Sequence, residues 1–194
     1  MTDRYTALMP SGVTRRLLTT ADYHSMIEAG ILGPEDRVEL LAGEIYEAAS
    51  VGSPHSGCVM RLTRWFSDRV GERALVNVQN PVEISKLSEP EPDLSLLEPR
   101  ESFYADRNPR PEEVLLLIEV AVTSYDFDRR VKLPLYAAAG IREVWIIALE
   151  QSVVEVHRDP AEGSYRSQRS LRRGDTLTPL AMRDLRLDVS YLLG

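Results

Sequence analysis

The chain has 194 residues, of which 43% are hydrophobic and 27% are charged, and its formal net charge is −7. This length supports one well-filled core, so we expect a single domain over residues 1–194, with its core in roughly 20–150. The acidic balance argues against a protein that coats nucleic acid by bulk electrostatic attraction, although acidic metal ligands would also contribute negative charge. The single cysteine, Cys58, excludes an intramolecular disulfide and a CxxC zinc site, and we expect it to be buried.

No apolar stretch approaches the length of a membrane-spanning helix, and the N-terminus lacks a charged segment followed by an apolar secretion core. We therefore expect a cytoplasmic protein with no membrane partner. Arginines gather on one predicted helix and near the C-terminus, namely Arg61, Arg64, Arg69, Arg166, Arg169, Arg172 and Arg173. Since no known nucleic-acid-binding signature accompanies them, we interpret these arginines as solvated surface charge.

The first elements predicted along the chain are a short helix and a hairpin. Thr20 can cap a helix over residues 21–29. Strands over residues 38–41 and 44–46 flank the tight turn Ala42-Gly43. A helix followed by a two-stranded hairpin is therefore expected before residue 50.

A second, longer helix is predicted from Ser53 as N-cap and Pro54 at the first helical position, and it ends at Gly71. Apolar residues repeat along it at three- and four-residue spacing, namely Val59, Leu62, Trp65, Phe66 and Val70. His55 lies in the first turn, where backbone N–H groups and the helix dipole favour an anion and a neutral imidazole. His55 is therefore a candidate for accepting a proton or contacting phosphate, and a surface histidine is the alternative.

Three strands are predicted next, at about 73–78, 81–85 and 93–97. The third carries Asp93, which directly follows a proline. An Asp at this position is a candidate ligand or only a turn residue, because its side chain readily bonds local backbone. The long loop over residues 99–111 is either a flap over the site or a surface connection.

The apolar run from Val114 to Val122 contains one carboxylate, Glu119. A stretch so rich in Val, Leu and Ile predicts a strand that is buried on both faces. An unpaired charge there would cost several kcal/mol, so the carboxylate needs a cation. Exposure of Glu119 at a sheet edge, or pairing with an arginine, is the alternative.

A helix is predicted to begin near Asp128. Within it, Lys132 and Tyr136 are four residues apart and share one face, so both can point toward the sheet. Pro134 should bend this helix unless its regular turns start only there. Lys132 is a candidate for stabilising charge near Glu119, and an ordinary surface lysine is the alternative.

The chain is predicted to continue with a buried strand over residues 143–149. Residues 153–158 then pair with residues 165–170 around a turn at 159–163, as a peripheral C-terminal β-hairpin. Strands and helices in this order predict an α/β (α+β) fold, in which a mixed β-sheet is flanked by helices.

Asp93 at a strand start, Glu119 inside the next buried strand and Lys132 nearby resemble the pattern by which PD-(D/E)xK nucleases hold a divalent metal. Two carboxylates on adjacent strands can supply the hard oxygen ligands that Mg²⁺ or Mn²⁺ prefers, and leave other positions to water and phosphate. The usual Glu-x-Lys spacing would put the lysine at Ala121. Lys132 could reach the same volume from the following helix.

Further motifs resemble the Uma-two family of restriction-endonuclease-like domains over roughly residues 20–193. They are Gly43-Glu-Ile, Ser53-Pro-His55, Val78-Gln79-Asn-Pro81, Glu91-Pro-Asp-Leu94, Ile118-Glu-Val-Ala121, Tyr125-Asp, Val131-Lys-Leu-Pro-Leu-Tyr136 and Ala137-Ala-Ala-Gly-Ile-Arg-Glu-Val-Trp145. Ala148 departs from the family, which often has Asp there. The resemblance implies a PD-(D/E)xK fold and a metal-dependent endonuclease with DNA as substrate; a homodimer remains open.

Two weaker site residues complete the predicted set. Glu44 on the hairpin could be an additional metal ligand, with Glu39 and Glu47 as competitors. Gln79 could orient a water or a phosphate, or could lie on the surface at a strand end. The sequence thus leaves two functions open, which are a Mg²⁺- or Mn²⁺-dependent DNA endonuclease and a catalytically silent relative that binds protein or nucleic acid.

Overall fold

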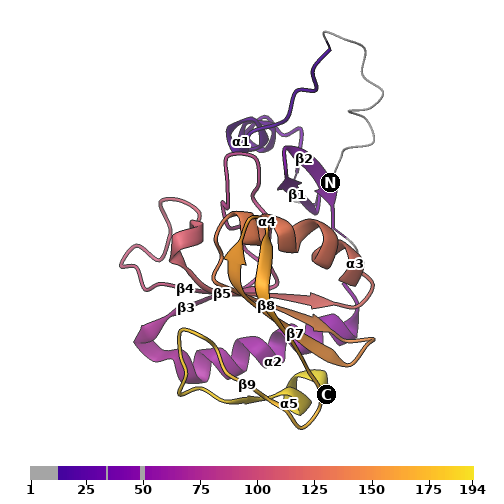
Figure 1. Ribbon diagram of the computed structural model, residues 1–194. Helices are drawn as coiled ribbons and strands as arrows, with labels where there is room; N and C mark the ends of the chain where they lie inside the picture. Colours follow the sequence, from indigo (N-terminus) through magenta and orange to yellow (C-terminus); the bar gives the residue numbers. More distant parts are fainter. Residues whose placement is uncertain (1–12, 34, 49–50) are drawn as a thin grey trace.

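The computed structural model describes residues 13–33, 35–48 and 51–194, and is built around a six-stranded sheet (Figure 1). The strands, in spatial order, are β3 (Leu75–Asn77), β4 (Leu94–Leu97), β5 (Val114–Ala121), β6 (Glu143–Ala148), β7 (Val153–Ala161) and β8 (Ser164–Leu171). Neighbouring strands are antiparallel, except that β5 and β6 are parallel. The predicted mixed sheet flanked by helices is confirmed.

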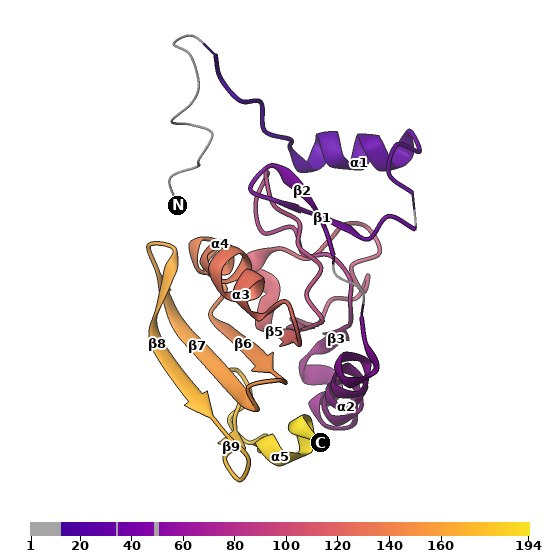
Figure 2. The same ribbon diagram turned by 90° about the vertical axis from the view of Figure 1, so that its right-hand side faces the viewer.

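Helices cover both faces of this sheet, and a smaller unit projects from it (Figure 2). The helices are α1 (Thr20–Glu28), α2 (Ser53–Val70), α3 (Tyr125–Phe127), the π-helical turn η4 (Asp128–Lys132), α4 (Leu133–Ala138) and α5 (Val189–Leu193), with 3-10 turns η2 (Gly71–Arg73) and η3 (Pro111–Glu113). Short strands β1 (Val38–Leu41) and β2 (Glu44–Glu47) form one hairpin, and β9 (Thr176–Leu177) pairs with β10 (Leu187–Asp188). None of the helices in the described ranges is long and apolar enough to cross a membrane.

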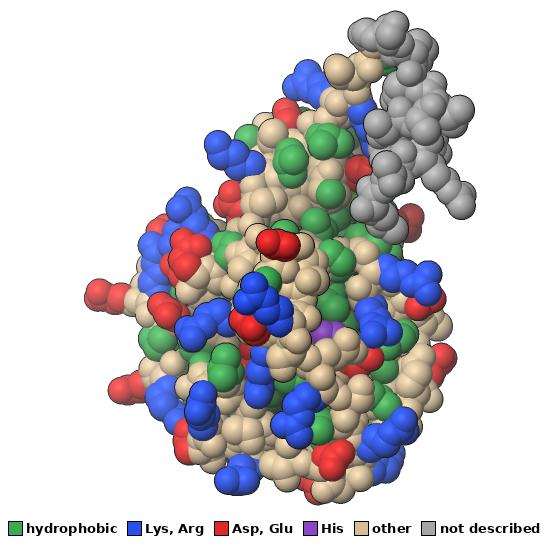
Figure 3. All heavy atoms as spheres, viewed as in Figure 1, with side chains coloured by type: hydrophobic (Ala, Val, Ile, Leu, Met, Phe, Trp, Pro, Cys, Tyr) green, Lys and Arg blue, Asp and Glu red, His purple; other side chains and the backbone are tan. Residues whose placement is uncertain are grey.

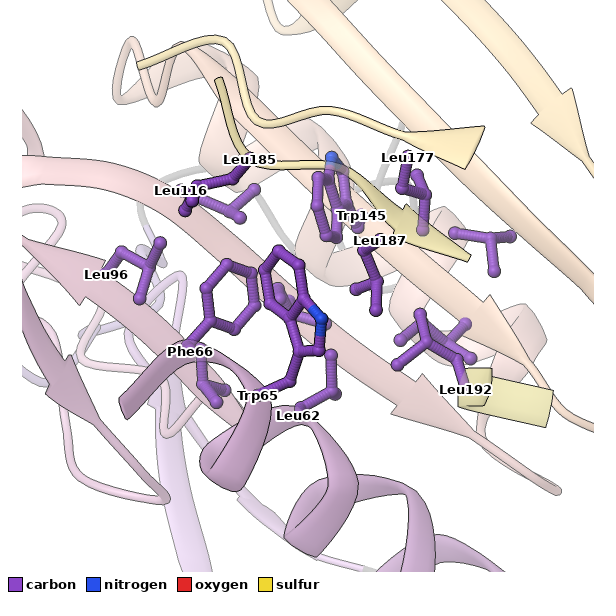
Figure 4. Close-up of a cluster of buried hydrophobic side chains, with 14 of the residues drawn as sticks. Leu62, Trp65, Phe66, Leu96, Leu116, Trp145, Leu177, Leu185, Leu187 and Leu192 are labelled. Atoms are coloured by element: carbon purple, nitrogen blue, oxygen red, sulfur yellow. The ribbon is translucent and has the colours of Figure 1, made fainter. Parts of the chain in front are cut away.

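The alternation of side chains along β5 divides the core into two layers. Leu116, Ile118 and Val120 pack on the α2 face, in the cluster whose largest members are labelled in Figure 4. Leu117 and Ala121 point to the opposite face, which α4 covers with Tyr136. Because successive strand residues face opposite sides, Glu119 also points to the α4 face.

The starts of the first two long helices differ from prediction by one residue each. Thr19, not Thr20, caps α1, since its hydroxyl accepts from the Asp22 N–H and the Asp22 carboxylate accepts from the Thr19 N–H. Such a reciprocal pair satisfies two free N–H groups at once. Gly52, not Ser53, is the N-cap of α2, and Pro54 lies in its first turn as expected.

The strand predicted at residues 81–85 is wrong. Val82 and Glu83 donate to the carbonyls of Pro90 and Pro109, which lie outside the sheet, and Ser85 forms only an isolated bridge. Val82 and Ile84 instead pack in the core layer that contains Leu97, Val114 and Leu117. The apolar residues in 81–85 are therefore buried without joining the sheet.

The C-terminal hairpin exists but is not peripheral, because β7 pairs along all of β6 and β8 is the edge strand of the main sheet. The strands extend to Ala161 and Ser164, and the turn is only Glu162-Gly163, with φ angles of 50° and 75°. Two successive positive φ values suit a tight hairpin turn. The five-residue turn predicted over 159–163 is thus wrong.

Cys58 is buried in the core as predicted. The arginines also find local partners: Arg61 donates to the Leu192 carbonyl, Arg69 stacks on Trp65, and Arg173 donates to the Gly194 carbonyl. On the face shown in Figure 3, Lys and Arg side chains are interspersed with Asp and Glu. This arrangement favours the interpretation that the arginines are surface charges balanced by nearby acids and carbonyls.

Candidate active site

The antiparallel pairing of β4 with β5 brings Asp93 and Glu119 to one place. Leu94 lies opposite Ile118, so the residues just beyond this pair, Asp93 and Glu119, are also neighbours. One carboxylate oxygen of Asp93, Oδ2, accepts a 2.8 Å hydrogen bond from the Val120 N–H. Both acids line one cavity of about 800 Å³.

Glu119 is 3% exposed, and its carboxylate is contacted by side chains from α4 and from the turn before it. The Lys132 ammonium lies 3.3 Å from Oε1 of Glu119, and the Tyr136 hydroxyl donates to the same oxygen at 2.5 Å. The buried carboxylate therefore has the cation that its position requires. Because both donors use Oε1, the other oxygen, Oε2, has no hydrogen-bond partner within the described residues.

A π-helical turn places Lys132 over the sheet. The Leu133 N–H donates to the Asp128 carbonyl, five residues back, and the regular turns of α4 begin at Leu133, with Pro134 in its first turn. The helical backbone is continuous through α3, η4 and α4, and the widened turn directly before Pro134 accommodates a residue that has no N–H to donate to the preceding turn. The wider turn adds one residue before α4, and such turns are frequent at functional sites.

The hairpin contributes Glu39 to the cavity. The carboxylate of Glu39 lies 3.0 Å from the Lys132 ammonium and accepts a 3.1 Å bond from the Glu91 N–H. Glu44, the predicted ligand, instead pairs with Arg15, accepts from the Tyr46 hydroxyl at 2.7 Å and does not line the cavity. Of the three acids considered on the hairpin, Glu39 is therefore the one in contact with the central lysine.

His55 and Gln79 surround Asp93. The His55 Nε2 atom lies 2.9 Å from Oδ1 of Asp93, and the Gln79 amide donates to that oxygen at 3.4 Å. Gln79 also donates its backbone N–H to the Asp93 carbonyl and adopts a φ of 50°. The other ring nitrogen of His55, Nδ1, is buried and has no hydrogen-bond partner in the described part of the chain. The predicted residues Asp93, Glu119, Lys132, His55 and Gln79 thus line one cavity.

Acids outnumber the single buried lysine in this cavity. They include Glu39, Glu91, Asp93, Glu119 and Asp128. Burial raises the pKa of Glu119 well above its usual range, and the nearby ammonium only partly opposes this. Burial likewise raises the pKa values of Asp128 and Glu91. The Lys132 pKa is also raised, because Glu119, Glu39 and Asp128 outweigh its own burial, so the ammonium stays charged.

The raised pKa of Glu119 predicts a gain in stability for Glu119→Gln. The folded protein binds the Glu119 proton more tightly than the unfolded chain, so ionisation costs folding free energy as pH rises above about 4.5. The metal-free variant should equal the parent in unfolding free energy at pH 4 and exceed it at pH 8. Urea unfolding in EDTA at both pH values tests this, and a variant that loses stability at pH 8 would contradict it.

The donor chemistry of the cavity fits a hard divalent cation. Within the described ranges, no three His, Cys, Asp or Glu side chains are already arranged as a metal cluster. Glu119 Oε2 is nevertheless unengaged, and the side chains that contact the Asp93 carboxylate are His55 and Gln79, both through Oδ1. Two carboxylates that keep spare lone pairs suit an ion that retains several waters.

The loop over residues 99–110 takes no part in this cavity. None of its residues lines the wall, and it is fastened to itself by Arg100–Asp106 and Arg107–Glu113 ion pairs. Of the two interpretations left open for this loop, the structure favours the surface connection over the flap.

The comparisons with known proteins show the family and the fold. The family model Uma2, described as "Putative restriction endonuclease", matches residues 20–190. A crystal structure of a putative nuclease from Anabaena variabilis is similar, with a TM-score of 0.70 and 16% identity over 91% of this chain and 97% of that chain, which shows a shared fold. No curated protein matches. Because the family match spans nearly all of the 194 residues, the chain belongs to the Uma2 (Uma-two) family of restriction-endonuclease-like proteins.

Proposed function

We propose that this protein is a divalent-metal-dependent endonuclease that hydrolyses phosphodiester bonds in DNA. The observation that carries the proposal is the juxtaposition, in one cavity, of Asp93, the buried Glu119 and a buried Lys132. The family supports a nuclease-like function. The metal and the choice of DNA rest on the chemistry of these residues and on the family resemblance.

Asp93 and Glu119 are the residues that would hold Mg²⁺ or Mn²⁺. When bound there, such an ion supplies an activated water and offsets negative charge on the phosphate. The protein fixes both carboxylates in advance: the Val120 N–H and His55 orient Asp93, while Tyr136 and Lys132 orient Glu119. Fixed ligands reduce the reorganisation that binding and catalysis would otherwise require.

Lys132 would stabilise the charge that develops on the phosphate. Its ammonium is 5% exposed and is held between Glu39 and Glu119, so it acts in a site largely closed to water. Electrostatic interactions are stronger in such surroundings than in solvent. Glu39 would position the lysine. Glu44, which was predicted as an additional metal ligand, has no role in this proposal because it does not line the cavity.

His55 and Gln79 complete the proposed site around Asp93. The His55 imidazole turns Nε2 toward Asp93 and lies in the first turn of α2. An imidazole is a group that can take up a proton released in hydrolysis. Gln79 is placed to orient a water molecule or a phosphate oxygen next to Asp93.

One observation favours the alternative of a catalytically silent binding protein. Oε1 of Glu119 already contacts the Lys132 ammonium and the Tyr136 hydroxyl, so the acid has a cation beside it without a metal. Such an arrangement would also persist in a relative that has lost catalysis.

Incubation of the purified protein with supercoiled plasmid separates the two functions. With Mn²⁺ or Mg²⁺ the plasmid should be nicked or linearised, and EDTA should stop the reaction. If no single- or double-stranded DNA or RNA is cleaved under either metal, although Mn²⁺ binds, the endonuclease proposal fails and the binding protein remains.

A further inference from the structure

A second cavity lies beside the candidate active site, at the β3 edge of the sheet. It has a volume of about 450 Å³, and its walls come from the end of β3 and from the loop over residues 99–110. In Figure 1 this loop projects at the left of the view, next to β3 and β4. The proposed catalytic residues do not line this cavity, so its side chains are not explained by the chemistry above.

The two cavities lie on either side of the segment that follows β3. Gln79 lines the active-site cavity, and the next residue, Asn80, lines the second one. Asn77, on the same wall, donates to the Ser95 hydroxyl, two residues beyond Asp93. The second cavity is thus within about two strand residues of Asp93, roughly 7 Å, which is on the order of the spacing between neighbouring nucleotides.

The loop presents an aromatic ring in a fixed position. Phe103 is 73% exposed, and both Phe103 and Tyr104 have positive φ angles, of 50° and 59°. Non-glycine residues adopt this conformation rarely, and mainly where surrounding structure enforces it. Here the loop is fixed by the hydrogen bond from the Tyr104 hydroxyl to the Glu98 carbonyl and by the ion pairs of Arg100 and Arg107.

The composition of the walls indicates what the cavity would bind. Phe103 supplies the open aromatic surface, since the Tyr104 ring is covered by the guanidinium groups of Arg100 and Arg107. Asn77, Asn80 and Asn108 supply amides in the lining. Arg107 pairs with Glu113 through both terminal nitrogens, and Arg100 donates to Asp106 through Nη2 while its Nη1 is buried, so neither guanidinium faces the solvent-exposed Phe103 ring as a free phosphate ligand. Aromatic faces bordered by amide donors and acceptors match the flat face and polar edge of a nucleobase.

We infer that this cavity is a subsite for one unpaired nucleobase, next to the phosphodiester bond that is cleaved, with Phe103 as the stacking residue. This inference rests on the proposed nuclease function and refines its substrate. A base inside a duplex cannot stack on Phe103, so the substrate strand must be single-stranded or locally opened at this nucleotide. Phe103 is a binding residue, because it lies outside the cavity that holds Asp93 and Glu119.

Binding of fluorescein-labelled single-stranded oligodeoxynucleotides, measured by anisotropy in EDTA, tests the subsite without cleavage. Phe103→Ala and Phe103→Leu should each weaken binding by roughly 5- to 150-fold, the range that corresponds to one base–aromatic stack. Met60→Ala, which removes another exposed apolar side chain (67% exposed) outside the cavity, should bind as the parent does. An oligonucleotide without bases should bind the parent and Phe103→Ala equally weakly.

The F103W variant gives a direct signal for stacking. The natural tryptophans, Trp65 and Trp145, are buried, so the added fluorescence reports on position 103. Quenching by the normal oligonucleotide but not by the base-free one is expected. Equal affinity of the parent and Phe103→Ala, an equal loss for both oligonucleotides, or no binding by the parent would overturn the subsite. Plasmid cleavage is measured separately. If the protein cleaves plasmid but shows no base-dependent binding, the subsite is rejected and the nuclease proposal stands. If base-dependent quenching is seen but no cleavage, the nuclease proposal is rejected and the base-binding site stands.

Discussion

Replacement of Asp93 by Asn should lower the rate of metal-dependent DNA cleavage by about two orders of magnitude or more. Asn keeps the shape of the side chain and an oxygen that can accept from the Val120 N–H, so the end of β4 should keep its structure. It loses the negative charge that would attract the ion. Single-turnover cleavage of plasmid at saturating Mn²⁺ measures the effect.

Asp184→Asn is a matched control for this substitution. Asp184 pairs with Arg73 on the surface, with 64% of its side chain exposed, and does not line the cavity. The Asp184→Asn variant should cleave plasmid at the parental rate. Cleavage by Asp93→Asn at the same rate as Asp184→Asn would point to a contaminating nuclease and remove the support for this site.

Replacement of Lys132 by Ala should reduce the free energy of unfolding of the metal-free protein by about 3–5 kcal/mol, because it leaves buried acids without their cation. The ammonium contacts Glu39 and Glu119, which are 8% and 3% exposed. Urea unfolding at pH 7 in EDTA measures the change. The rate of cleavage should also fall, but by less than in Asp93→Asn if the ion carries most of the electrostatic stabilisation.

Lys86→Ala is the natural comparison, since the chain has only one other lysine and it is exposed. An exposed substitution of this kind should change stability by no more than about 0.5 kcal/mol. Added Mn²⁺ should stabilise Lys132→Ala more than it stabilises the parent, because the ion would restore positive charge among the acids. If Lys132→Ala unfolds at the same urea concentration as Lys86→Ala, the buried ion pairs do not hold the site together.

The central acid Glu119 could be predicted because the pattern that reveals it is local. A carboxylate inside the apolar run of β5 had to be either paired or functional. Glu119 is buried against Lys132 and Tyr136, which are four residues apart and so share a helix face. Asp93 at a strand start could by itself have been only a turn residue, and it was linked to Glu119 through the resemblance to the PD-(D/E)xK pattern; the pairing of β4 with β5 makes the two residues neighbours.

The choice among the hairpin acids could not be made in the same way. Glu39 lies in the apolar stretch Val38-Glu-Leu-Leu41, which is the same signal that marked Glu119, but Glu44 was preferred by resemblance. Which acid faces the cavity depends on how the hairpin packs against the segment before β4, including the bond from the Glu91 N–H to Glu39. That contact joins residues 52 positions apart, so no local pattern contains it.

The π turn before α4 shows a second limit. Pro134 allowed either a bent helix or regular turns that begin near the proline, and the structure has the latter, with a five-residue step at Asp128. The wider turn depends on burial of Asp128 and Lys132 against the sheet, which local propensity does not encode. The prediction of a strand at residues 81–85 was wrong for a related reason, since their apolar side chains are buried although their backbone joins no sheet.

Calorimetric titration of the purified protein with Mn²⁺ tests most directly whether Asp93 and Glu119 form a metal site. The parent should bind the ion with a measurable heat, Asp93→Asn should lose most of this binding, and Asp184→Asn should keep it. Lack of Mn²⁺ binding by the parent, or equal binding by all three proteins, would contradict the account.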